Sequence, residues 1–147
     1  MFDYFANPSR FRKIACFILP FLEIACFFSL GYGLYLALFN SPADYQQGNA
    51  VRIMYIHVPS AWLALSSYLL LGICSFFFLI WRHPLAEIAA RSIAPIGTGF
   101  AFLTLITGSL WGKPIWGVWW AWDGRLTSML VLFFFFIGYI SLSNAFD

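Results

Sequence analysis

The sequence predicts an all-α membrane protein with four transmembrane helices. Of its 147 residues, 62% are hydrophobic and only 10% are charged, whereas soluble domains carry about 25% charged residues. A helix that crosses the roughly 30 Å hydrocarbon core of a bilayer needs around 20 apolar residues. Four runs of about that length, separated by short polar loops, occur at residues 14–39, 62–81, 93–111 and 126–142. We therefore expect a single polytopic membrane domain over residues 1–147.

The distribution of cations predicts how these helices are oriented. The first apolar run is too long for a secretory signal, whose apolar core has roughly 7–15 residues, so we interpret it as a retained anchor. Lys and Arg are enriched in cytoplasmic loops. The more basic side contains Arg10, Arg12, Lys13, Arg82 and Arg91, and the other contains Arg52, Lys113 and Arg125. This bias places the N-terminus and loop 82–92 in the cytoplasm and loops 40–58 and 112–125 on the outer side.

One candidate site residue, His57, lies in the stretch YIHVPSAW, two residues before Pro59. The fixed φ and missing N–H of proline suit the first turn of a helix. We therefore expect Pro59 to begin the second helix and His57 to lie at the outer membrane boundary, after an apolar segment 51–58 that fits either a strand or an interfacial helix. A neutral imidazole can bind haem iron as an axial ligand. Alternatively, His57 is an interfacial histidine that hydrogen-bonds to loop carbonyls or lipid headgroups.

The second candidate feature is the segment WGKPIWGVWWAWDG, which places five tryptophans in twelve positions. The spacing of Trp116, Trp119 and Trp120 predicts a short helix from about Pro114 with three indoles along one face. Gly112 and Gly117 would permit close backbone approach, and a flat porphyrin can stack on such a surface. Alternatively, the indoles only anchor the protein at the membrane interface, where tryptophan is enriched. The five residues are Trp111, Trp116, Trp119, Trp120 and Trp122.

The charged residues beside these motifs can bind a ligand, and for most of them a local structural role is the alternative. Arg52, Lys113 and Arg125 lie on the side expected to be less basic, and they can pair with the carboxylates of a bound haem. Equally, Arg125 can pair with Asp123, and Lys113 can extend into the headgroups. Asp123 can accept hydrogen bonds from a ligand, although we favour a cap at the start of the fourth helix.

Function classes other than haem binding also fit parts of the sequence. Glu23 lies inside the first apolar run, where an ionisable group is costly and often functional, so the main rival is a small proton-coupled multidrug exporter. A membrane assembly subunit without a ligand is a third interpretation. The sequence contains no nucleic-acid signature, no catalytic constellation that would indicate an enzyme and no CxxCH motif for a covalently attached haem.

The two motifs, YIHVPSAW and WGKPIWGVWWAWDGRLTSML, closely resemble the CcmC family, whose members are the haem-handling protein C of cytochrome c maturation within the WWD superfamily. The resemblance covers nearly the whole chain. It implies that haem b is bound non-covalently and transiently at the outer, periplasmic face of the bacterial inner membrane. The implied partners, besides haem and membrane lipid, are the haem chaperone CcmE and the subunits CcmD, CcmA and CcmB.

The resemblance also implies roles for individual residues. It makes His57 an axial ligand of the haem iron and assigns the haem platform to Trp111, Trp116, Trp119, Trp120, Trp122 and Asp123. Charge pairing with carboxylates, and not the resemblance, assigns Arg52 and Arg125 to the propionates. Family members have six transmembrane helices and a second histidine ligand between the last two, whereas this chain stops at Asp147. We therefore expect it to lack those helices, and His83 lies on the wrong side to replace the missing ligand.

Overall fold

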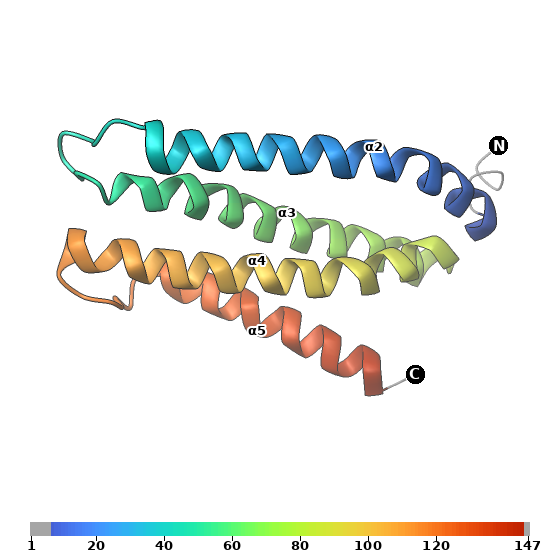
Figure 1. The fold of residues 1–147 in the computed structure, drawn as a ribbon. Coiled ribbons are helices and arrows are strands. Elements are labelled where there is room, and N and C mark those ends of the chain that lie inside the picture. The colour runs from blue at the N-terminus through green and yellow to red at the C-terminus, as the bar shows by residue number, and fades with distance from the viewer. Residues whose placement is uncertain (1–6, 146–147) are drawn as a thin grey trace.

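The computed structural model describes residues 7–145, and these form four long helices that run side by side in antiparallel order (Figure 1). Each helix is long and apolar enough to cross a membrane. The elements are α2 (Pro8–Tyr35), its short π-helical extension η1 (Leu36–Asn40), α3 (Val51–Trp81), α4 (Pro84–Trp116) and α5 (Gly124–Ala145). The prediction of an all-α, four-span membrane protein is confirmed.

The helices extend beyond the apolar runs at 14–39, 62–81, 93–111 and 126–142. The largest difference is in α3, which begins at Val51, so that Pro59 lies inside the helix. The expectation that Pro59 begins this helix is wrong. Membrane helices tolerate an internal proline, and this helix continues through Ser60, whose hydroxyl donates to the Ile56 carbonyl at 2.7 Å. Residues 51–58 are therefore a part of the helix and not a strand.

The core of the bundle lies along α4, which packs between α3 and α5. Apolar burial drives helix association weakly in a membrane, so small residues that allow close backbone approach dominate the interfaces. In contrast to α4, nearly all described side chains of α2 are exposed. The buried residues of α4 are Ala86, Ala90, Ala94, Gly97, Ala101, Thr104, Thr107, Gly108 and Gly112.

Adding a single methyl group at the tightest helix contact is expected to lower the stability of the protein. A Cβ on Gly97 would overlap the ring of Phe136, which extends from α5 and is fully buried. We expect Gly97→Ala to lower the free energy of unfolding by about 1–3 kcal/mol, because overpacking forces the helices apart. Gly99→Ala is the matched control, since its Cβ meets nothing within 4 Å. Unfolding of both variants in detergent, followed by circular dichroism, checks this, and equal stability would contradict it.

Candidate functional site

The candidate site lies at one end of the bundle. Loop 41–50, which joins α2 to α3, and loop 117–123, which joins α4 to α5, lie together at the left of Figure 1. The indole Nε1 of Trp111 donates a hydrogen bond to the Gln47 side-chain oxygen at 2.9 Å and so connects α4 to the first loop. The structure therefore brings His57, the tryptophans and the three nearby cations to the same end. That this end faces outward remains a prediction.

His57 lies within α3 and not at its boundary. It is six residues beyond Val51, which at 1.5 Å per residue is about 9 Å along the helix axis. Its ring contacts α4, where Nδ1 is 3.0 Å from the hydroxyl oxygen of Thr107. The Cε1 atom lies 3.1 Å from the position of a Cβ on Gly108. His57 therefore bonds to a neighbouring helix rather than to a loop carbonyl, in contrast to the alternative interpretation.

The tryptophan segment does not form the predicted helix. Instead, α4 continues through Pro114 and ends at Trp116. Gly117 caps it in the left-handed conformation with φ 78°, which favours glycine and ends helices. Trp119 and Trp120 therefore lie in an irregular loop, so the prediction that they share a helix face with Trp116 is wrong.

The five indoles form no single flat sheet. Trp111 and Trp116 pack edge to face with ring centroids 5.0 Å apart, and Trp120 and Trp122 do so at 5.4 Å. The most exposed rings are those of Trp122, at 79% exposure, and Trp119, at 56%. The partly buried Trp111 and Trp120 each pack against one more exposed ring, Trp116 and Trp122 respectively.

The two glycines of this segment have different roles. A Cβ on Gly112 would lie 3.2 Å from the Trp116 ring and 3.3 Å from the Val118 carbonyl. The loop therefore folds back closely over α4, as expected for Gly112. Gly117 has open space around it, so its contribution is the left-handed turn and not close approach.

All three cations of the site interact with the protein. The guanidinium of Arg125 lies 5.0 Å from the centroid of the Trp116 ring, and Lys113 Nζ lies 5.8 Å from that of Trp119. Both are within the range of cation–π attraction. Lys113 also donates to the Gly117 carbonyl at 3.0 Å. Arg52 donates to the Ser41 carbonyl at 3.1 Å, while its Nε is buried with no hydrogen-bond partner within residues 7–145. Two of the three cations thus lie against indole rings.

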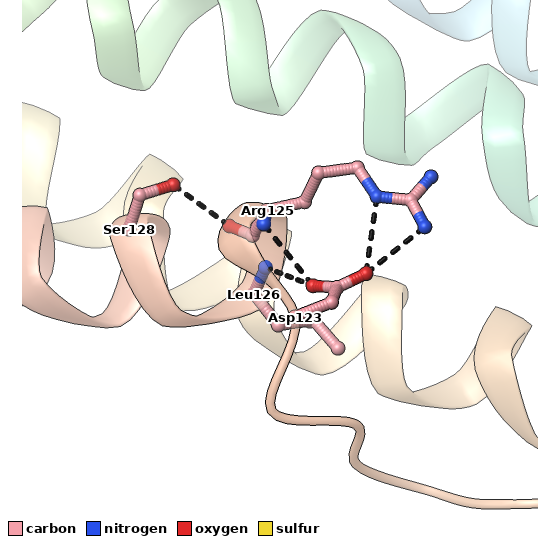
Figure 2. Close-up of polar contacts among 4 residues, drawn as sticks. All are labelled: Asp123, Arg125, Leu126 and Ser128. Carbon is pink, nitrogen blue, oxygen red and sulfur yellow. Dashed lines mark hydrogen bonds and ion pairs between the residues drawn. The ribbon is translucent and has the colours of Figure 1, made fainter.

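Asp123 caps α5, as favoured from the sequence. One carboxylate oxygen accepts from the backbone N–H of Arg125 at 3.1 Å and of Leu126 at 2.9 Å (Figure 2). The other accepts from the Arg125 guanidinium, with Nη2 at 2.9 Å. The predicted local pair between Asp123 and Arg125 is therefore also confirmed. Leu126 in turn approaches Gly108, the glycine that His57 contacts, so the cap fixes the start of α5 beside the histidine.

Protonation of Asp123 is expected to weaken this cap only in acid. The hydrogen bond from the Leu126 N–H, followed by those from Arg125, lowers the pKa of Asp123. The stabilisation is therefore complete above the ordinary aspartate pKa of about 3.9 and is lost as the pH falls through the lowered pKa. We expect the NMR signal of the Leu126 amide to titrate with a midpoint below about 3.9. Asp123→Asn keeps a capping oxygen and should abolish this titration, whereas an unchanged titration would contradict the assignment.

Sequence reasoning missed two residues of the site. Thr107 bonds to His57, and Gln47 bonds to Trp111. The sequence did contain a signal that Thr107 is buried against another helix. Thr104, Thr107 and Gly108 continue the stripe of small residues that α4 buries. Nothing in the sequence indicated Gln47, since its partner is 64 positions away.

The described residues bring one histidine, His57, to this end of the bundle. Within residues 7–145, no three His, Cys, Asp or Glu side chains are grouped to hold a metal ion. His83, the other histidine, begins α4 at the opposite end of the bundle (Figure 1). A metal bound at His57 would therefore bring most of its ligands with it, which is the case for the iron of haem.

Glu23, the basis of the exporter alternative, is separate from this site. It lies on the exposed surface of α2, in a shallow apolar groove that includes Cys26, Phe27 and Leu30. It makes no hydrogen bond or ion pair with any residue between positions 7 and 145. The geometry thus gives the carboxyl group no coupled partner for proton transfer within this part of the chain.

Comparisons with known proteins identify the family. The family model described as "Heme exporter protein C" matches residues 1–147. The chain is similar to proteins of that name from two bacteria. The Bradyrhizobium diazoefficiens protein is 50% identical over 97% of this chain and 54% of its own length. The Escherichia coli K12 protein is 46% identical over 97% of this chain and 58% of its own length. A third, from Paracoccus denitrificans, is 41% identical over 96% of this chain and 58% of its own length. The chain thus spans little more than half the length of these relatives. It belongs to the Heme exporter protein C family, CcmC.

Proposed function

We propose that this chain binds haem at the end of the bundle that carries His57 and the tryptophan loop, and presents it for delivery during the maturation of c-type cytochromes. The observation that supports this most directly is the convergence of one imidazole, exposed indoles and cations from three separate parts of the chain. The family membership and the names of the relatives support the same function. No step of covalent chemistry is required, so the proposed role is transport and not catalysis.

Each group of residues would supply a different part of the binding energy. His57 would donate an imidazole nitrogen to the iron as an axial ligand. The exposed rings of Trp116, Trp119 and Trp122 would stack on the porphyrin, at roughly 0.5–1.5 kcal/mol per contact beyond burial. The partly buried Trp111 and Trp120 would hold these rings in place, and Asp123 would fix Arg125 close to them.

The propionates of haem would be balanced by arginine. The Arg125 side chain, at the start of α5, is 77% exposed and is held at one side by Asp123, so it can turn toward an anion. Arg52 has one hydrogen-bond donor, Nε, that no atom of the described residues satisfies. Arginine forms strong, charge-assisted bonds with carboxylates. These two residues are therefore the proposed partners of the propionates.

An open site suits a protein that must release its ligand. The exposed indoles leave one face of a bound porphyrin accessible, which would permit transient binding of haem b and transfer to the chaperone CcmE. We place this event at the periplasmic face of the bacterial inner membrane, with CcmD, CcmA and CcmB as the other partners. Because His57 is the only histidine at this end among the described residues, the second axial position would be filled by a group outside them.

The direct test is a haem titration of the chain in lipid nanodiscs, followed by the Soret absorption band. We expect saturable binding of one haem per chain, above the linear partitioning seen with empty nanodiscs. Iron-free protoporphyrin should bind more weakly, because it can stack on indoles but cannot accept an axial ligand. Haem uptake identical to that of empty nanodiscs would contradict the proposed function.

A further inference from the structure

We infer that Thr107 fixes the tautomer of His57, so that Nδ1 carries the proton and Nε2 keeps the lone pair that would bind iron. The link to iron rests on the proposed function, but the tautomer itself does not. One hydrogen bond between α3 and α4, which joins His57 Nδ1 to the Thr107 hydroxyl, holds the ring before any ligand is present. Thr107 is thus a positioning residue, acting through His57.

The hydrogen-bond arrangement around the Thr107 hydroxyl determines the direction of the bond to His57. Its oxygen lies 2.7 Å from the Leu103 carbonyl and 3.3 Å from the Thr104 carbonyl, and 3.0 Å from His57 Nδ1. A threonine hydroxyl has one proton to donate, and carbonyl oxygens can only accept. The proton therefore points to Leu103, the nearer carbonyl. The hydroxyl oxygen is left to accept from His57, which requires a proton on Nδ1.

The opposite tautomer would leave the buried Thr107 hydroxyl with one hydrogen bond fewer. With the proton on Nε2, Nδ1 becomes an acceptor, and the Thr107 hydroxyl must turn away from Leu103 to donate to it. One of the two bonds is then lost. Because Thr107 is only 7% exposed, water cannot readily replace that bond, and buried polar groups strongly favour being paired. The arrangement with Nδ1–H is therefore the better satisfied one.

The neighbouring glycine keeps the ring in this position. The His57 ring lies against Gly108, where a Cβ would be 3.1 Å from Cε1 and 3.4 Å from a methyl carbon of Leu126. The absence of a side chain at Gly108 thus lets the imidazole approach α4 closely enough to reach Thr107. In metal sites, a second hydrogen bond of this kind sets the tautomer and the orientation of the ligating histidine.

Three variants separate this role from general packing. Thr107→Ser keeps the hydroxyl, whereas Thr107→Val keeps the shape of the side chain but removes the hydroxyl. Thr104→Val is the matched control, because Thr104 is also buried on α4, one turn earlier, and donates to the Phe100 carbonyl at 2.8 Å. Circular dichroism of each variant checks that the helices are retained.

The first readout uses no haem. In ¹⁵N-histidine-labelled chain in nanodiscs, at a pH where the ring is neutral, the ¹⁵N shifts of His57 report which nitrogen is protonated, and His83→Gln assigns the signals. We expect Nδ1–H in the wild type, Thr107→Ser and Thr104→Val, and a mixture of tautomers in Thr107→Val. A wild-type ring protonated at Nε2, or a tautomer unchanged in Thr107→Val, would overturn the inference.

The second readout is haem affinity in the same nanodiscs. Loss of an outer hydrogen bond to a metal ligand typically weakens binding by about 10- to 100-fold, and we expect Thr107→Val to fall in this range and Thr107→Ser to recover most of the affinity. Haem binding that survives His57→Ala unchanged would refute the role of His57 as an iron ligand in the proposed function without altering the tautomer result. Unchanged affinity in Thr107→Val, with His57→Ala defective, would refute the positioning role alone.

Discussion

Replacing His57 with alanine is expected to reduce haem affinity by at least roughly 10- to 100-fold. A loss of that size is typical when a metal site loses a residue that only hydrogen-bonds to a ligand, and His57 is proposed as the ligand itself. The reason is that His57 is the one histidine that residues 7–145 bring to the tryptophan end of the bundle. Its replacement removes the proposed iron ligand and leaves only stacking and charge pairing. Titration of the variant with haem in nanodiscs, followed by the Soret band, measures the change.

His83→Ala is the matched control for this variant. His83 is also a histidine beside a long helix, but it precedes α4 at the opposite end of the bundle (Figure 1). We expect its haem affinity and Soret band to equal those of the wild type. Identical Soret bands for His57→Ala and the wild type would remove His57 from the site, and a defect in His83→Ala alone would move the site to the other end.

The double variant Trp119→Ala/Trp122→Ala is expected to bind haem roughly 5- to 150-fold more weakly. These two rings are the most exposed of the loop, at 56% and 79%. Aromatic contacts are worth about 0.5–1.5 kcal/mol each beyond burial, so the loss of two amounts to about 1–3 kcal/mol. Because both residues lie in the irregular segment after Gly117, helix formation should be unaffected. Haem titration and circular dichroism test the two statements separately.

The other two tryptophans of the chain provide the control. Trp62 and Trp81 are similarly exposed, at 68% and 61%, but extend from α3 outside the loop. If indoles act here only as membrane anchors, Trp62→Ala/Trp81→Ala and the loop variant should have equal haem affinity. We expect a loss in the loop variant alone. The same comparison with iron-free protoporphyrin should give a similar ratio, because stacking does not depend on iron.

The helices could be predicted from the sequence because each is defined by its own composition. Long apolar runs must be helical in a bilayer, where backbone groups need internal hydrogen bonds. The cap at Asp123 and the ion pair between Glu87 and Arg91, with Nη2 and Oε1 2.9 Å apart, were also predictable, because their partners lie within four residues. Local chemistry of this kind depends little on the rest of the fold.

The tryptophan loop shows where sequence patterns mislead. The spacing of Trp116, Trp119 and Trp120 fits one face of a helix, yet Gly117 adopts φ 78° and ends α4 between them. A periodic pattern indicates which residues would align if the helix continued, but it does not predict where the helix ends. Conversely, Pro59 suggested a helix start, although α3 continues through it. A glycine turn decides the first case, and in the second a proline lies inside a continuous transmembrane helix.

By itself, the sequence determined the class of the protein, its four helices, the motifs that resemble the CcmC family and the residues worth testing, because each of these is encoded in composition or in short stretches. Only the tertiary structure decided that His57 meets Thr107 across 50 positions and that Gln47 meets Trp111 across 64. Contacts of this kind depend on the relative rotation and depth of packed helices. Those are set by small residues such as Gly97 and Gly108, whose importance becomes visible only once their neighbours are known.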